Sequence, residues 1–176
     1  LKKFPETTFR RNEFKTLLTI DSDQPFAYRA KNIFRNTGGF VRDILKDRKV
    51  SLDRYRVLSG LQKDPFQVYD YIIEKIEENS VDTRFFFPTG DLTRYDKNPS
   101  WRNKKYRDFI RTISGKYCNG IHPSYYSADD HKVLAKQIMR LETITGKKVE
   151  ASRFHYLRFS IPFSYPAQYY IFVLWV

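Results

Sequence analysis

The chain has a single cysteine, Cys118, among 176 residues, which excludes internal disulfide bonds and zinc sites built from several thiolates. A metal site would have to use histidine and carboxylate side chains instead. No apolar run approaches the roughly 20 residues that a helix needs to cross a bilayer, and no signal-peptide pattern is visible. We therefore expect a soluble protein and favour the cytoplasm, but the compartment stays open because the sequence begins with Leu1 rather than Met.

Several catalytic signatures are also missing. The sequence contains no glycine-rich phosphate loop, no Gly-x-Ser-x-Gly turn and no His-Glu-x-x-His helix. These absences argue against a nucleotide hydrolase, a serine esterase and a metalloprotease, respectively.

Acidic residues are outnumbered by basic ones, with 20 Asp and Glu against 32 Lys and Arg and a net charge of +12. Such a charge favours an anionic partner, for example nucleic acid, acidic polysaccharide or phospholipid. The basic residues are scattered along the chain, however, which is typical of a solvated surface rather than of a phosphate-binding track. We therefore expect no nucleic-acid partner.

Hydrophobic residues make up 41% of the chain and aromatic residues 17%, enough for one core and hence one domain over residues 1–176. Strands are predicted over 14–20, 83–87, 116–121, 156–161 and 170–176, with another starting at Val149. Helices are predicted from Asp64 to about Ser80, through 106–113 until Gly115, and from 127–130 to Gly146, and residues 27–47 as loop and helix interrupted at Gly38 and Gly39. This alternation is typical of an α/β fold with parallel strands and helical crossovers, in a barrel or an open sheet.

Two carboxylates, Asp21 and Asp23, directly follow the first predicted strand. If the chain stays extended, both lie on one face, where they could share a metal or divide the roles of base and ligand. A strand-terminal aspartate also commonly caps the next turn, so a structural role stays open. Because the carboxyl ends of parallel strands meet at one edge, we expect these residues to converge with Asp91, His122 and residues 153–155.

The histidines extend this candidate site. His122 follows the strand 116–121, and an imidazole with one or two carboxylates suits Zn²⁺, Co²⁺ or Fe²⁺. Arg153 and His155 would share one face of a later strand, where Arg153 could orient a carboxylate and His155 could be a third ligand or a general acid. The alternatives are a structural histidine at 122 and a cationic strand face paired with surface acids. His131, near a helix start, is expected to be exposed.

Aromatic residues are frequent in the predicted loops. Their flat rings could stack on sugar faces, although core or hinge packing explains each of them equally well. The residues are Tyr28, Tyr95, Trp101, Tyr125 and Tyr126.

These motifs resemble the polysaccharide deacetylase superfamily, also called NodB-like or carbohydrate esterase family four, and specifically a divergent bacterial branch. Residues 19–23 (Thr-Ile-Asp-Ser-Asp) resemble its first motif and residues 84–87 with Gly90 its second strand. Residues 120–124 resemble its histidine motif, and residues 152–155 lie where an arginine-bearing motif is expected. The resemblance implies a deformed (β/α) barrel. Related chains continue past residues 165–166 into further barrel strands, so we expect either that residues 1–176 are part of a longer domain or that the C-terminal tail is altered.

The resemblance also implies an activity, the hydrolytic removal of acetyl groups from an N-acetylated glycan or polysaccharide with a divalent metal, usually zinc. By position, Asp21 would be the general base, and Asp23 and His122 would be metal ligands. His155 would donate a proton to the leaving amine, with Arg153 beside it as part of the catalytic group.

The second histidine of the family pattern would fall at Tyr126. The third metal ligand is therefore left open between His155, a hydroxyl group and water. An alternative function follows, in which the chain keeps the fold as a non-catalytic carbohydrate- or polyanion-binding module. The unmatched position and the charge of +12 motivate this alternative.

Overall fold

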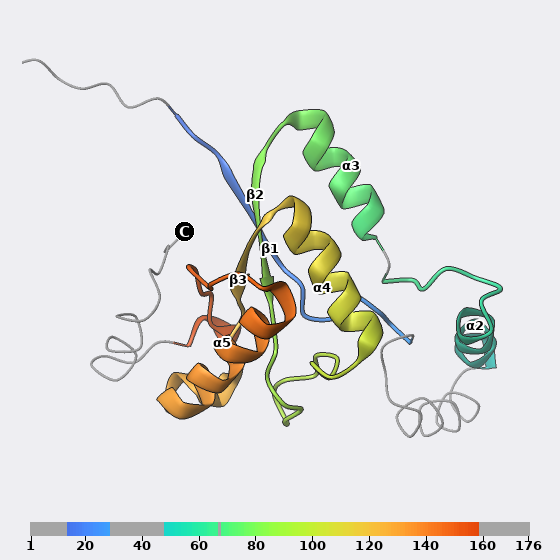
Figure 1. Ribbon diagram of the computed structural model, residues 1–176. Coiled ribbons are helices and arrows are strands. Elements are labelled where there is room, and N and C mark those ends of the chain that lie inside the picture. Colours follow the sequence, from blue (N-terminus) through green and yellow to red (C-terminus); the bar gives the residue numbers. More distant parts are fainter. Residues whose placement is uncertain (1–13, 29–47, 67, 159–176) are drawn as a thin grey trace, which may run out of the picture.

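The computed structural model of the protein describes residues 14–28, 48–66 and 68–158. Three strands, β1 (Leu17–Asp21), β2 (Asp82–Phe87) and β3 (Cys118–Ile121), form a parallel sheet in the order β1-β2-β3. The described helices are α2 (Arg48–Leu58), α3 (Tyr69–Asn79), α4 (Lys104–Lys116) and α5 (His131–Thr145), with 3₁₀ turns η1 (Tyr125–Ala128) and η2 (His155–Leu157) (Figure 1). The described part is thus a mixed α/β fold with parallel strands, as predicted.

The hydrophobic core joins one face of the sheet to helices α3, α4 and α5. Phe85 and Phe87 of β2 are fully buried there, because alternate residues of a strand point to the same face. The helices contribute Ile76, Tyr106, Ile110, Ile113, Leu141 and Ile144. Each of the three helices therefore buries one apolar face against the sheet.

Tyr106 also fixes the chain that leaves the sheet. Its side chain is fully buried in α4, and its hydroxyl donates a hydrogen bond of 2.8 Å to the carbonyl of Pro88, just after β2. Burial raises the pKa of the Tyr106 hydroxyl well above its ordinary value, so it stays a donor. The loop after β2 is thereby held in place at the carboxyl edge of the sheet.

Helices α4 and α5 both begin at a polar capping residue, but α5 begins at His131, after the 3₁₀ turn η1, rather than at Ser127 as predicted. The side chain of Asn103 accepts a hydrogen bond from the Tyr106 N–H at the start of α4. At the start of α5, Asp130 accepts from the backbone of the first turn. Gly146 ends α5 with a φ of 70°, a left-handed conformation that glycine adopts without a steric penalty. The α4 helix continues one residue past Gly115, which was predicted to stop it.

The predicted helix start at Asp64 is wrong. Helix α3 begins at Tyr69 after Val68, which supplies no side-chain cap. The Asp64 carboxylate instead accepts hydrogen bonds from the N–H groups of Ala27 at 2.6 Å and Tyr28 at 2.8 Å. This aspartate therefore fastens the segment after β1 rather than starting a helix.

The strands predicted after α5 also differ. Between Val149 and Arg158 the chain forms only an isolated parallel bridge, from Ser152 to Ile121, and then the 3₁₀ turn η2. The predicted region 29–47, with Gly38 and Gly39, and the predicted strand 170–176 lie outside the described residues. The described residues contain a three-stranded sheet and no closed barrel, so the barrel and the single domain over 1–176 stay predictions. Within the described residues, every helix is too short or too polar to cross a bilayer.

Candidate metal centre

The candidate site lies at the carboxyl edge of the parallel sheet. β1 ends at Asp21, and the N–H of Ser22 still bonds to β2 at 2.9 Å, so that Asp23 is in the loop just beyond the pairing. His122 follows β3 directly, and its N–H bonds to the last carbonyl of β2 at 3.0 Å. The ends of two strands thus bring a carboxylate and an imidazole to one edge.

A third segment reaches this edge beside β3. The N–H of Ile121 donates to the Ala151 carbonyl at 2.9 Å, and the N–H of Arg153 donates to the Ile121 carbonyl at 3.0 Å. Gly120 allows this approach, because a Cβ at that position would lie 2.8 Å from the Ala151 oxygen. The bridge brings Arg153 and then His155 to the site.

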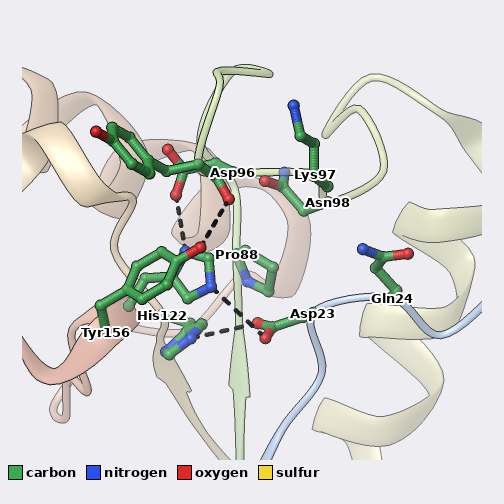
Figure 2. Close-up of a pocket in the computed structure, with 10 residues that line it drawn as sticks. Asp23, Gln24, Pro88, Asp96, Lys97, Asn98, His122 and Tyr156 are labelled. Carbon is green, nitrogen blue, oxygen red and sulfur yellow. Dashed lines mark hydrogen bonds and ion pairs between the residues drawn. The ribbon is translucent and has the colours of Figure 1, made fainter.

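Asp23, His122 and His155 form a group that can hold a metal ion. One potential ligand atom from each residue lies within 4.8 Å of the other two. The Oδ1 atom of Asp23 is 3.2 Å from Nε2 of His122, and its Oδ2 atom is 3.8 Å from Nε2 of His155. Figure 2 shows the Asp23 carboxylate pointing toward His122 across the edge of the sheet.

The tautomer of His122 is fixed by its backbone partner. Nδ1 lies 2.5 Å from the carbonyl oxygen of Arg153, which can only accept a hydrogen bond, so Nδ1 carries the proton. Burial lowers the pKa of His122, although the nearby Asp23 and Asp21 carboxylates oppose this shift. The ring is therefore neutral near neutral pH, and the lone pair of Nε2 faces the Asp23 carboxylate.

His155 is arranged in the same way around a different partner. Its Nδ1 lies 2.9 Å from Oδ1 of Asp96, a side chain that is only 2% exposed. Asp96 is itself held by the N–H of Tyr125 at 3.0 Å and the hydroxyl of Thr93 at 2.6 Å. A carboxylate that orients a histidine through Nδ1 is the usual support for metal binding through Nε2.

These contacts fit a cation between the three side chains. A neutral Nε2 and an ionised carboxylate both present lone pairs, so the 3.2 Å contact between His122 and Asp23 lacks a proton to bridge it. Oδ1 of Asp23 is buried and has no hydrogen-bond donor among the described residues. A metal ion would satisfy both groups, since neutral imidazole and carboxylate are common ligands of divalent metals.

Asp21 and Arg153 form a second pair beside this group. Nη1 of Arg153 lies 3.3 Å and 3.5 Å from the two carboxylate oxygens of Asp21, and its guanidinium lies over the ring of Phe86, 5.7 Å from the centroid. Arg153 and His155 were predicted on one face of a strand. Because η2 replaces that strand, Arg153 turns to Asp21 while His155 turns to Asp23 and Asp96.

Other predicted candidates lie elsewhere. Asp91 pairs with Arg140 at 3.0 Å, a contact that lowers the pKa of the Asp91 carboxyl. Asp91 does not line the cleft that opens beside Asp23, His122 and His155. Tyr126, the position of the family's second histidine, is 48% exposed and also lies outside the cleft lining. His131 is exposed at the start of α5, as predicted.

The structure adds residues that the sequence did not indicate. A cleft of about 190 Å³ opens beside the candidate metal ligands, and its lining includes Asp96, Lys97 and Tyr156 (Figure 2). Asp96 lies in the polar stretch after β2, and the rule that loops after parallel strands share one edge could have identified that loop. No local pattern marked Tyr156, which belonged to a predicted strand.

Comparison with models of known protein families gives no match, and no curated protein matches the chain. Among solved structures, the chain is similar to IcaB from Ammonifex degensii, with a TM-score of 0.43 and 14% sequence identity. The match covers 89% of this chain and 81% of that chain. Similarity at this level does not assign a family, so the function has to be inferred from the site and the sequence motifs.

Proposed function

We propose that the protein is a metal-dependent hydrolase that removes acetyl groups from the N-acetylated sugars of a glycan, using a divalent metal held by Asp23, His122 and His155. The observation that carries this proposal is the meeting of these three side chains, with ligand atoms within 4.8 Å of one another. Each residue comes from one of the motifs that resemble those of the deacetylase superfamily.

We further propose zinc as the metal. Two imidazole nitrogens and one carboxylate oxygen suit zinc among the divalent metals. Three protein ligands are also typical of catalytic zinc sites, whereas structural sites usually have four. Bound there, the metal would polarise the acetamide carbonyl and increase the acidity of water.

His155 is assigned in this proposal as the third ligand rather than as the general acid. Its Nδ1 is engaged by Asp96, so Nε2 is the nitrogen that remains for chemistry, and Nε2 faces Asp23. One nitrogen cannot bind a metal and donate a proton at the same time. The assignment also removes the need for a ligand at Tyr126.

Asp21 is the proposed general base. Its side chain is 35% exposed, and Arg153 holds the carboxylate from one side. Arg153 links Asp21 to the candidate metal ligands, because its side chain binds the Asp21 carboxylate while its backbone carbonyl accepts from Nδ1 of His122. Asp21 would accept the proton of the attacking water, while Arg153 keeps its oxygens oriented.

Metal content and acetate release test the proposal together. Zinc bound per chain would be measured after loading and desalting, and acetate would be measured after incubation with tetra-N-acetylchitotetraose. We expect stoichiometric zinc in the native chain and its loss in Asp23→Asn, His122→Ala and His155→Ala. His131→Ala is the matched control, because it removes an exposed histidine outside the site and should keep the zinc. Retention of stoichiometric zinc by all three ligand variants would overturn the metal centre.

The binding-module alternative is favoured by the charge of +12 and by the exposed Lys97 in the cleft lining. It predicts no bound zinc and no acetate release, together with binding to anionic glycans that weakens as salt is added. The same purified chain therefore separates the two functions.

A further inference from the structure

The cleft is too small to enclose a sugar chain. Its volume is about 190 Å³, whereas pockets that enclose a whole small ligand typically measure about 300–1,000 Å³. An acetamido group and part of one ring therefore occupy the cleft in the proposed reaction. Any further sugar of a glycan has to lie on the surface at the mouth of the cleft.

Two tyrosines that line the cleft, Tyr95 and Tyr156, pack against two that do not, Tyr125 and Tyr126, and the four are called here the tyrosine rim. Tyr95 and Tyr125 stack with ring centroids 4.0 Å apart. The ring of Tyr156 meets them edge-on, with centroid distances of 6.2 Å to Tyr95 and 5.8 Å to Tyr125. Tyr126 contacts the same two rings at 5.8 Å and 5.4 Å. The rim thus combines the loop after β2 with η1 and η2.

Two rings of the rim remain open to a ligand. Guanidinium groups already lie over Tyr95 and Tyr125, those of Arg94 at 5.1 Å and Arg158 at 4.4 Å. Among the described residues, no cation lies over Tyr126 or Tyr156. These two side chains are 48% and 62% exposed, and Tyr156 also lines the cleft.

The backbone holds Tyr156 in an unusual conformation next to the metal centre. Tyr156 and Leu157 have φ angles of 61° and 49°, in the left-handed region that side chains other than glycine rarely adopt. The turn places the Tyr156 ring against His155, with centroids 4.3 Å apart, and its hydroxyl 3.5 Å from the carbonyl of Tyr95. Strained residues of this kind cluster where a ligand is positioned.

We propose that the tyrosine rim, with Tyr156 as its principal ring, is a subsite that stacks a sugar neighbouring the one in the cleft, so that the ligand is an oligomeric or polymeric N-acetylated glycan. The inference rests on the proposed function for the sugar in the cleft, and it adds the requirement for a chain. Sugar rings present apolar C–H faces that pack on flat aromatic rings, while the tyrosine hydroxyls remain at the wet edge. Figure 2 shows Tyr156 on the same side of the cleft as His122.

Equilibrium binding tests the subsite without relying on turnover. The whole 176-residue chain, treated with a chelator, would be titrated with N-acetylglucosamine and with tetra-N-acetylchitotetraose. We expect the tetramer to bind about tenfold more tightly than the monomer, the gain that one good aromatic stack supplies. Tyr156→Ala should remove most of this preference, and Tyr156→Phe, which keeps the ring, should retain it.

Tyr71→Ala is the matched control, since Tyr71 is 61% exposed on α3 and does not line the cleft. Circular dichroism and the melting temperature would show whether each variant is folded. Equal affinity for monomer and tetramer in the native chain, or an undiminished preference in folded Tyr156→Ala, overturns the subsite. A preference that depends on Tyr156 in a chain without zinc or acetate release supports the subsite while rejecting the hydrolase.

Discussion

The carboxylate of Asp96 lies 2.9 Å from Nδ1 of His155 and is almost completely buried. It therefore links the loop after β2 to the turn that carries one corner of the candidate metal centre. Asp96 also accepts from Tyr125 and Thr93, so its position does not depend on His155 alone. Asp96 is therefore the clearest candidate for a residue that positions the proposed metal site without being a ligand itself.

Replacing Asp96 should weaken the metal centre without removing a ligand. In Asp96→Asn the amide can turn its NH₂ group toward Nδ1, which favours the wrong tautomer of His155. We expect zinc affinity to fall about 10- to 100-fold, as for other residues that orient metal ligands. Competition with a zinc chelator measures the affinity. Asp91→Asn is the control, because Asp91 contacts Arg140 outside the cleft, and an equal loss in both variants would contradict the role of Asp96.

Gly120→Ala should disturb the site from the backbone. The new methyl group would lie 2.6 Å from the ring of Phe86 and 2.8 Å from the Ala151 oxygen. Residues 151–153, called here the bridge segment, must therefore move away from β3. We expect the free energy of unfolding to fall by about 1–3 kcal/mol, as for other overpacked positions. Chemical denaturation measures this change.

The matched control for Gly120 is Gly115. It lies in α4, and a Cβ there would meet nothing within 4 Å. Gly115→Ala should therefore stabilise the chain by about 0.5–1 kcal/mol, because alanine is the better helix former. If Gly120→Ala leaves the free energy of unfolding unchanged, the bridge segment can shift without destabilising the protein.

The sequence predicts the parallel sheet and much of its carboxyl edge. The apolar strand at 83–87 and the apolar helix faces around Ile72, Ile110 and Leu141 can be read from the spacing of hydrophobic residues. The same residues pack in or against the core of the folded protein. Residues that directly follow a strand, such as Asp23 and His122, are placed by topology alone. Their meeting could therefore be expected before any contact was known.

Long-range contacts and strained turns could not be predicted in this way. Asp64 precedes a proline and resembles a helix start, yet its carboxylate binds backbone N–H groups 37 and 36 residues away. The alternating residues around His155 resemble a strand, but Tyr156 and Leu157 adopt left-handed angles that no local pattern favours. The partnership of Asp96 with His155 likewise spans 59 residues.

The strain at Leu157 gives a further prediction. Its side chain is 72% exposed and its φ is 49°, so glycine should relieve the strain while removing little contact. The relief of about 1–2 kcal/mol exceeds the roughly 0.5–1 kcal/mol that glycine loses in chain entropy. Leu157→Gly should therefore raise the free energy of unfolding by about 0.5–1 kcal/mol.

Thermal or chemical denaturation measures the effect at Leu157, and Leu61→Gly is its control. Leu61 is 75% exposed but does not have a positive φ, so glycine there should lower the free energy of unfolding instead. Equal destabilisation in both variants would show that the turn at Leu157 is not strained in solution.

Arg153 should act on catalysis through its side chain and on the metal through its backbone. The guanidinium contacts Asp21, whereas the carbonyl oxygen accepts from Nδ1 of His122. Arg153→Ala keeps the carbonyl, so zinc content should stay stoichiometric while acetate release falls. Asp21→Asn should also keep zinc and should slow acetate release by about 10²- to 10⁴-fold, the usual contribution of a general base.

A double variant decides whether the two side chains work as one unit. If Arg153 acts only by orienting Asp21, then Arg153→Ala should add almost nothing to the loss already caused by Asp21→Asn, because the effects of contacting residues are not additive. Independent losses would instead mean that the guanidinium contacts the substrate itself. Loss of zinc from a folded Arg153→Ala protein would contradict the division of roles, since it would mean that the backbone carbonyl alone does not hold His122 in place.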